Sequence, residues 1–286
     1  MSITLHKYHG LGNDYLVYDP HINHLELTPE RIRLLCDRHY GLGADGLLLG
    51  PIFEGTDIRV KIYNPDASEA TNSGNGIRIF ARFLRDTGYT KEKKFDLLTD
   101  SGRVDIECLK DDSSVTRVSL GAANYWGEAR DAGGRDVPGE QIMFEGAEHF
   151  MTCLYLGNPN CVVPMENISA QLAIEMGECI ARSEQFAGGI NFNLMKVHDR
   201  GNIDIEVFER GAGYTLASGA GAGAAASTAY SLGLTDINVT VHMPGGTIEV
   251  EIAEDGNVFM TGTVESVGIT ELTREFEHKL LLVSGD

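Results

Sequence analysis

The segment Ile58–Leu84, IRVKIYNPDASEATNSGNGIRIFARFL, decides the fold because it predicts a strand, a polar loop, a glycine-rich turn and a helix in succession. Its first residues alternate between apolar and polar side chains, as in a half-buried strand. Ser73 precedes the predicted helix, and serine is a favoured N-cap. Ile77 and the residues at i+3, i+4 and i+7 are apolar, which predicts a helix with one buried face.

The same pattern recurs 145 residues later. The strand-like run IDIEVFER (Ile203–Arg210) corresponds to IRVKIYN, and Ser218-Gly219-Ala220-Gly221 corresponds to Ser73-Gly74-Asn75-Gly76. Two further pairs keep the order: Gly12-Asn13 with Gly157-Asn158, and a hairpin glycine at 102 with one at 246. Four pairs in one order at nearly constant spacing indicate an internal duplication.

Each half therefore predicts mixed strands around one helix, which is an α/β (α+β) fold with two pseudo-symmetric halves. The central helices are expected at Ile77–Arg85 and Ala222–Leu232, and a second helix in each half near Pro29–Arg38 and Ile168–Arg182. No Pro/Ser-rich linker separates the halves, so the repeat alone places the boundary. We expect one half at residues 1–119, with the C-terminal segment 266–286, and the other at 120–265.

Composition excludes several classes of protein. The formal net charge is −19, which argues against a nucleic-acid partner. The start MSITLHKYHG lacks a signal-peptide pattern, and no apolar run reaches the roughly 18 residues of a membrane span, so no membrane partner is expected. The five scattered cysteines favour a reducing compartment, and we expect a cytoplasmic protein.

Neither a cofactor nor a metal ion is predicted. The chain has no GxGxxG fingerprint in a βαβ unit and no phosphate-binding GxxxxGK[ST] loop. The nine histidines are dispersed, and the cysteines form no CxxC pair, so no metal-ligand spacing is present.

The glycine-rich turns are the best candidates for a binding site. The first amides of a helix have no intrahelical partner and lie at the positive end of its dipole, so they bind anions. Four asparagines at the ends of apolar runs offer fixed donors and acceptors for ammonium and carboxylate groups, and they are Asn13, Asn64, Asn158 and Asn191. Arg210 could bind a carboxylate through two hydrogen bonds. The sequence thus favours a small amino-acid ligand.

Several motifs, taken together, resemble diaminopimelate epimerase. They are HGLGNDY, DRHYGLGADGLLL, YNPDASEATNSGNGIRIFARFL, LGNPN, ERGAGYTLASGAGAGAAA and MPGGTIEVEI, in order over about Leu5–Leu272. The resemblance implies a cofactor-independent isomerase that interconverts LL- and meso-diaminopimelate, an activity of lysine biosynthesis. It implies two halves, each a strand barrel around a central helix, with the active site in the cleft. It also makes a homodimer plausible.

The chain departs from the family at both catalytic positions. There the family has cysteines, one removing the α-proton as thiolate and the other delivering a proton to the opposite face. This chain has Ser73 and Ser218. A thiol is readily ionised at a helix N-terminus, whereas a serine hydroxyl is scarcely ionised at neutral pH, and the sequence shows no base beside either serine. We therefore expect very low activity. Both a deliberate substitution that traps substrate, which we favour, and a natural member with altered chemistry explain the pair.

The resemblance assigns binding roles to matching positions. Those that hold the distal amino-acid group in the family are Asn64, Asn191 and Arg210. Those near the reacting centre are Asn13, Asn158, Glu209 and the turn amides of Gly74, Asn75, Gly219 and Ala220.

Two further departures leave the substrate open. Asn160 stands where the family has a histidine thought to assist one thiol, and Tyr214 stands where it has a second glutamate. The residues that match the family's distal binding group, Asn64, Asn191 and Arg210, are retained, and they favour diaminopimelate as the substrate. A racemase of the same fold acting on histidine is the first alternative, and a non-catalytic amino-acid-binding protein is the second.

Overall fold

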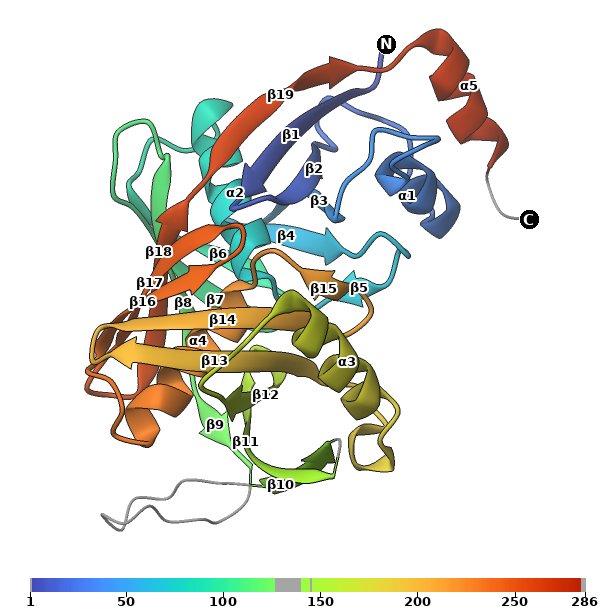
Figure 1. Cartoon of the computed structure of the whole chain (residues 1–286). Helices are drawn as coiled ribbons and strands as arrows, with labels where there is room; N and C mark the ends of the chain where they lie inside the picture. Colours follow the sequence, from blue (N-terminus) through green and yellow to red (C-terminus); the bar gives the residue numbers. More distant parts are fainter. Residues whose placement is uncertain (1, 127–139, 145, 284–286) are drawn as a thin grey trace. The chain divides into compact units, whose positions relative to one another are not determined.

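The computed structural model describes residues 2–126, 140–144 and 146–283 (Figure 1). The chain divides into two compact units: Met1–Val118 with Thr263–Asp286, and Ser119–Gly262. No helix among the described residues is long and apolar enough to cross a membrane. All five cysteines are free, and four are buried, with only Cys179 half-buried.

The described residues of the first unit form a mixed sheet, with both antiparallel and parallel strand pairs, and three helices. Its strands are β1 (Thr4–Gly10), β2 (Asn13–Tyr18), β3 (Gly46–Glu54), β4 (Asp57–Tyr63), β5 (Glu69–Ala70), β6 (Lys94–Thr99), β7 (Gly102–Cys108), β8 (Val115–Ala122, whose last residues belong to the second unit) and β19 (Glu265–Glu271). Its helices are α1 (Pro29–Cys36), α2 (Gly74–Asp86) and α5 (Arg274–Leu282). β2 and β3 are parallel, as are β4 and β6, and the other pairs are antiparallel.

The second unit repeats this arrangement. Its strands are β9 (Asn124–Tyr125), β10 (Glu140–Phe144), β11 (Ala147–Leu156), β12 (Asn158–Pro164), β13 (Asn191–Asp199), β14 (Asn202–Glu209), β15 (Gly213–Thr215), β16 (Asn238–Met243), β17 (Gly246–Ile252) and β18 (Asn257–Thr263). Its helices are α3 (Ala170–Ala181), a single 3-10 turn η1 (Glu184–Phe186) and α4 (Gly219–Ser231). The parallel pairs are β12 with β13 and β14 with β16.

The two units share one order of elements and one set of parallel pairs. In the first unit, α1 connects the parallel strands β2 and β3, and α2 lies between β4 and β6. In the second unit, α3 connects β12 and β13, and α4 lies between β14 and β16. Parallel neighbours need such a crossover, because a tight turn cannot join them. The mixed α/β fold predicted from the sequence is confirmed.

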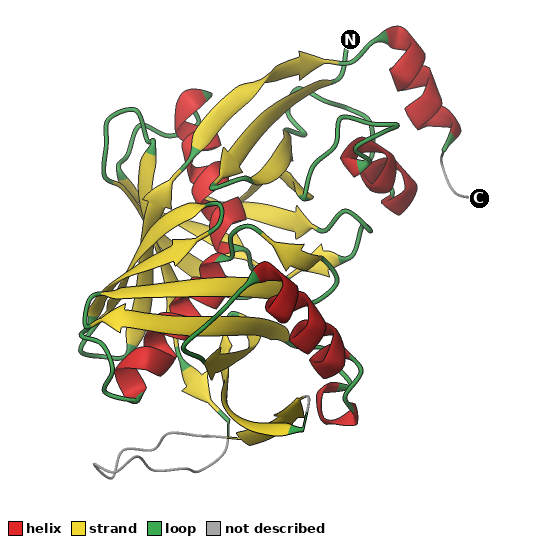
Figure 2. Ribbon diagram, viewed as in Figure 1, coloured by secondary structure: helices red, strands yellow, loops and turns green. Residues whose placement is uncertain are grey.

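Ten of the thirteen residues of α2 and ten of the thirteen of α4 are buried. Each helix packs against strands of its own unit (Figure 2). α4 is made of small residues because the surrounding strands approach it closely: a Cβ on Gly223 would lie 2.7 Å from the side chains of Leu120 and Leu156. Both helices begin three residues earlier than predicted, at Gly74 and Gly219. The serine cap compensates for the low helix propensity of glycine in the first turn. The predicted helices around residues 29–38 and 168–182 are confirmed, and they end at Cys36 and Ala181.

Close packing of α3 on β14 gives a test of this fold. A Cβ on Gly177 would lie 2.4 Å from Cγ of Phe208. We predict that Gly177→Ala lowers the free energy of unfolding by about 1–3 kcal/mol, because overpacking outweighs the roughly 1 kcal/mol that alanine gains over glycine in a helix. Urea unfolding measures this difference. Gly188→Ala is the control, since no atom lies within 4 Å of a Cβ there, and equal stability of the two variants would contradict the packing.

Candidate active site

Each unit places a serine at the N-cap of its buried helix. The Oγ atom of Ser73 accepts a hydrogen bond from the Gly76 amide at 3.1 Å, and Oγ of Ser218 accepts one from the Gly221 amide at 3.2 Å. Ser218 is 3% exposed, and Ser73 is half-buried. The serines satisfy the third amide of each helix.

Two amides precede the serine-capped amide in each helix. They belong to Gly74 and Asn75 in α2 and to Gly219 and Ala220 in α4. Helical geometry gives these amides no partner within the helix, and the helix dipole makes their surroundings favourable for an anion. Each helix start can therefore hold a carboxylate oxygen beside its serine.

In the first unit, Ser73 is paired with a phenol. The hydroxyls of Ser73 and Tyr15 lie 2.9 Å apart and form a hydrogen bond. Tyr15 lies on β2, is 7% exposed, and faces Gly46 on the parallel strand β3. A Cβ on Gly46 would lie 2.5 Å from the Tyr15 ring. Gly46 therefore makes the space that the ring occupies, and the sequence analysis identified neither residue.

In the second unit, Ser218 is paired with a carboxylate. Its hydroxyl donates to Oε2 of Glu209 at 3.0 Å, and the Thr215 hydroxyl donates to Oε1 at 2.7 Å. The sequence analysis found no base beside either serine, and for Ser218 that expectation is wrong. The antiparallel pairing of β14 with β15 brings Glu209, nine residues earlier in the chain, to this serine.

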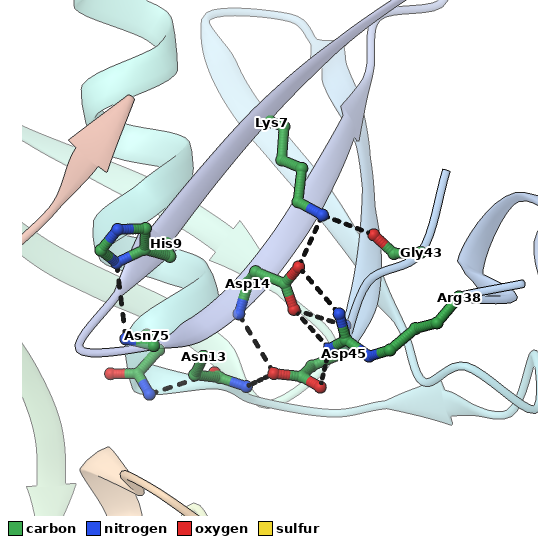
Figure 3. A network of polar contacts seen from close by, with 9 residues as sticks. Lys7, His9, Asn13, Asp14, Arg38, Gly43, Asp45 and Asn75 are labelled. Carbon is green, nitrogen blue, oxygen red and sulfur yellow. Dashed lines mark hydrogen bonds and ion pairs between the residues drawn. The ribbon is translucent and has the colours of Figure 1, made fainter. Parts of the chain in front are cut away.

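Asn13 and Asn75 are brought together in the first unit by a chain of hydrogen bonds (Figure 3). The guanidinium of Arg78 donates to Oδ1 of Asn75, whose amide nitrogen donates to Oδ1 of Asn13 at 3.1 Å. The Asn13 amide then donates to Asp45 at 3.1 Å. Because Arg78 can only donate, this chain fixes which way both amides point.

Arg78 is an unusual member of that chain. Its side chain is fully buried, and burial lowers the pKa of its guanidinium to about 10. Its other hydrogen-bond acceptor is the carbonyl oxygen of Thr263, at 3.3 Å. The arginine thus orients neutral amides, one turn below the N-terminus of α2.

An ion network supports the other end of the chain. Asp14 contacts Lys7 at 2.8 Å and Arg38 at 2.7 Å, and Arg38 also contacts Asp45 at 2.6 Å (Figure 3). Burial raises the pKa of the Asp14 carboxyl, but hydrogen bonds from Arg38 and Lys7 outweigh burial and lower it to about 2. Asp14 is therefore an anion at neutral pH, and it ties β1 and β2 to the loop before β3.

Asn158 and Asn160 form a second amide cluster, in unit two. Asn160 is fully buried and donates to both the side-chain and backbone oxygens of Asn158, at 2.8 and 2.9 Å. Asn193, which the sequence analysis missed, donates to the carbonyl of Cys161 at 3.1 Å. Its own Oδ1 is buried without a partner, and a Cβ on Gly221 would lie 2.3 Å from that atom. Glycine is therefore required at the start of α4.

Asn191 and Arg210 also lie together. The Asn191 side chain accepts a hydrogen bond from the Arg210 amide at 2.9 Å, and the Arg210 guanidinium donates to the carbonyl of Gly188 at 3.1 Å. Gly189 has a positive φ of 74°, and a Cβ there would lie 2.4 Å from Cδ of Arg210. The Arg210 residue as a whole is exposed.

Asn64 and Tyr214 have local partners. Asn64 belongs to the first unit and donates to the Ser68 hydroxyl at 2.9 Å in the turn after β4. Tyr214 donates to Glu206 at 2.6 Å, and burial, together with that bond, raises the pKa of its phenol to about 12. Tyr214 is therefore protonated at neutral pH. Across the part of the chain that the structure describes, His, Cys, Asp and Glu nowhere gather in threes suited to a metal ion.

Comparison with known proteins identifies the family. The model of the family described as diaminopimelate epimerase matches residues 5–126 and 152–267. The chain belongs to the diaminopimelate epimerase family. It is 41% identical to diaminopimelate epimerase 2 of Nostoc sp. over 96% of both chains. It is 34% identical to the diaminopimelate epimerase of Synechocystis sp., over 93% of this chain and 98% of that one.

A solved structure supports the fold. The hydroxyproline epimerase of Agrobacterium vitis, with bound trans-4-hydroxy-L-proline, superposes with a TM-score of 0.71 at 15% identity, over 94% of this chain and 90% of that one. At this identity the likeness concerns the fold alone, and it agrees with the mixed α/β architecture described above.

The buried Asp14 carboxylate gives a test of the ion network beside the start of α2. Because its pKa is lowered on folding, it stabilises the protein above the unfolded value near 4, and this contribution is lost as pH falls toward 2. We predict that Asp14→Asn lowers the free energy of unfolding by about 2 kcal/mol or more at neutral pH, and by progressively less below about pH 4. Denaturant titrations at several pH values measure the difference, with exposed Asp105→Asn as control. A loss independent of pH would contradict the ion network.

Proposed function

We propose that this chain is an amino-acid epimerase of the diaminopimelate type that binds LL- and meso-diaminopimelate and interconverts them very slowly. The proposal rests on one observation above the others. Each unit carries a serine at the N-terminus of its buried helix, with two helix amides beside it. A two-base mechanism needs one proton carrier for each face of the α-carbon, and positions 73 and 218 supply the two.

The helix starts also stabilise the transition state. Removing the α-proton leaves negative charge that spreads onto the substrate carboxylate. Amides of Gly74, Asn75, Gly219 and Ala220 are fixed donors of the kind that stabilise such charge without reorganising. No cofactor is needed for this step, and we propose none. Asn13, Asn158 and Glu209 are proposed to bind groups near the reacting carbon.

Slow turnover follows from the chemistry of the serines. A catalytic acid or base works best with a pKa near the operating pH. The thiol of free cysteine has a pKa of about 8.5 and is lowered further at a helix N-terminus, whereas a serine hydroxyl is far from ionisation at neutral pH. The binding groups are present, so we propose that the chain holds substrate better than it converts it.

Arg210 and Asn191 support diaminopimelate as the ligand. The arginine is exposed and carries a planar group that suits a carboxylate, and Asn191 holds its backbone in place. We propose that these two, with Asn64, bind the distal amino-acid group. L-lysine lacks the distal carboxylate and should bind more weakly.

A histidine racemase is the second candidate, favoured by Asn160 and Tyr214. Asn160 is bonded to Asn158 and carries no titratable group, and Tyr214 is a neutral phenol bonded to Glu206. A substrate that differs from diaminopimelate fits these changes. A cytoplasmic location and a homodimer are proposed from the family, and sedimentation of the purified chain tests the dimer.

Exchange of the α-proton into deuterated water tests the proposed function. We predict very slow exchange from LL-diaminopimelate with the chain as it stands, and an increase of at least about 100-fold in the double variant Ser73→Cys, Ser218→Cys, because effective acid–base groups contribute factors of 10² or more. NMR follows the loss of the α-proton signal. The two single variants are the controls and should each remain slow. Family-like rates from the unaltered chain, or an inactive double variant, would refute the proposal.

A further inference from the structure

Three amide side chains of the second unit are linked by hydrogen bonds. Asn160 and Asn193 are fully buried, and Asn158 is half-buried. Asn158 and Asn160 lie two residues apart on β12, so their side chains project from the same face of the strand. Nδ2 of Asn160 donates to Oδ1 of Asn158 at 2.8 Å, and Nδ2 of Asn193 lies 3.5 Å from Oδ1 of Asn160. The chain of amides therefore runs from Asn193 through Asn160 to Asn158.

Two backbone carbonyls fix the direction of this chain. A carbonyl oxygen can only accept a hydrogen bond, so an amide side chain must turn its nitrogen toward it. Nδ2 of Asn193 donates to the carbonyl of Cys161 at 3.1 Å, and Nδ2 of Asn160 donates to the carbonyl of Asn158 at 2.9 Å. Because the nitrogen of Asn160 faces it, the Asn158 side chain can meet Asn160 only with its oxygen.

The amide nitrogen of Asn158 is the group left at the end of the chain. None of the described residues accepts a hydrogen bond from Nδ2 of Asn158. The other end of the chain lies against the first turn of α4, since a Cβ on Gly221 would lie 2.3 Å from Oδ1 of Asn193. The buried amides thus leave Asn158 with N–H groups to offer and with its oxygen already engaged.

The equivalent asparagine of the first unit has the same orientation but different neighbours. With the 145-residue offset, Asn13 corresponds to Asn158. Oδ1 of Asn13 accepts from Asn75 at 3.1 Å (Figure 3). Asn75 in turn accepts from Arg78, which can only donate. Nδ2 of Asn13 is bonded to Asp45, whereas no described residue takes that place beside Asn158. One orientation reached by unlike chains supports a role for the orientation itself.

We propose that Asn160, supported by Asn193, is a positioning residue that holds Asn158 as a hydrogen-bond donor to a carboxylate oxygen of the bound amino acid. The role in binding rests on the proposed function, in which Asn158 contacts the ligand near the reacting carbon. An amino acid offers a carboxylate, which accepts hydrogen bonds, and an ammonium group, which donates them. The N–H groups of Asn158 match the carboxylate and not the ammonium group.

The chemistry of position 160 identifies two informative replacements. An ionised aspartate has nearly the size of asparagine but can only accept, so it cannot donate to either oxygen of Asn158. Leucine is also of similar size and carries no charge, and it leaves both oxygens of Asn158 without their donor. Both replacements remove the orienting bonds, and only the first adds charge.

Exchange of side-chain amide hydrogens tests the orientation in the ligand-free chain. The Asn160 amide is buried and bonded to two oxygens, whereas the Asn158 amide has no described acceptor. We predict that the amide hydrogens of Asn160 exchange with water at least about 10-fold more slowly than those of Asn158. NMR of the chain with isotope-labelled asparagine measures both rates. The variants Asn158→Asp and Asn160→Asp assign the two signals.

The variant Asn160→Asp should reverse the Asn158 side chain once the new carboxyl group is ionised. Only the nitrogen of Asn158 can face a carboxylate, so its amide hydrogens should exchange at least about 10-fold more slowly than in the unaltered chain. Asn238→Asp is the matched control, because Asn238 is exposed at the start of β16 in the same unit. It should leave exchange at Asn158 unchanged. A merely structural Asn160 would lower stability without this reversal.

Calorimetric titration with meso-diaminopimelate tests the role in binding. We predict that the affinity falls at least about 10-fold in both Asn160→Asp and Asn160→Leu, which corresponds to the loss of one hydrogen bond to a charged group. Asn238→Asp and Asn238→Leu should bind as the unaltered chain does. A loss in Asn160→Asp alone would indicate charge repulsion in place of orientation and would overturn the proposal.

The exchange rates also separate this inference from the proposed function. Slow exchange at Asn158, or fast exchange at Asn160, in the unaltered chain would contradict the orientation whatever the ligand. Failure of the proposed function would appear differently, as no binding of diaminopimelate by the unaltered chain.

Discussion

The structure depends on the start of a buried helix, used once in each unit. A helix N-terminus inside a protein must find partners for its amides, and here a serine side chain accepts a hydrogen bond from the third amide of each helix. Glycine in the first turn is required by close approach, most clearly at Gly221 beside Asn193. The surrounding strands, the crossover helices and the orienting asparagines hold this one feature in place.

The two N-cap serines, Ser73 and Ser218, decide what the proposed site can do chemically. The resemblance to diaminopimelate epimerase implies thiols in the same two turns, where this chain has Ser73 and Ser218. In the proposed function, binding and proton transfer are therefore separate tasks: we propose that the helix amides, the asparagines and Arg210 recognise the ligand, and that the side chain at the N-cap moves the proton. Replacing sulfur by oxygen is proposed to weaken proton transfer and to leave binding intact, because the serine keeps the helix cap.

The fold and the turns could be predicted from the sequence because they depend on local patterns and on a repeat. The alternation of apolar and polar side chains predicted the strands, and the Ser-Gly-x-Gly turns predicted the starts of α2 and α4 to within three residues. The partners of the serines could not be predicted. Tyr15 reaches Ser73 only through the parallel register that places Gly46 beside it, and Glu209 reaches Ser218 only through the β14–β15 pairing. Register is a tertiary property, set by which faces are buried.

Calorimetric titration of the unaltered chain tests the central claim most directly, since the claim is that the binding site is intact although the proton carriers are weak. LL-diaminopimelate, meso-diaminopimelate, L-histidine and L-lysine are the ligands to compare. The account predicts saturable binding of both diaminopimelate isomers, weaker binding of L-lysine and none of L-histidine. Tight binding of L-histidine, or no binding of either diaminopimelate isomer, would contradict it.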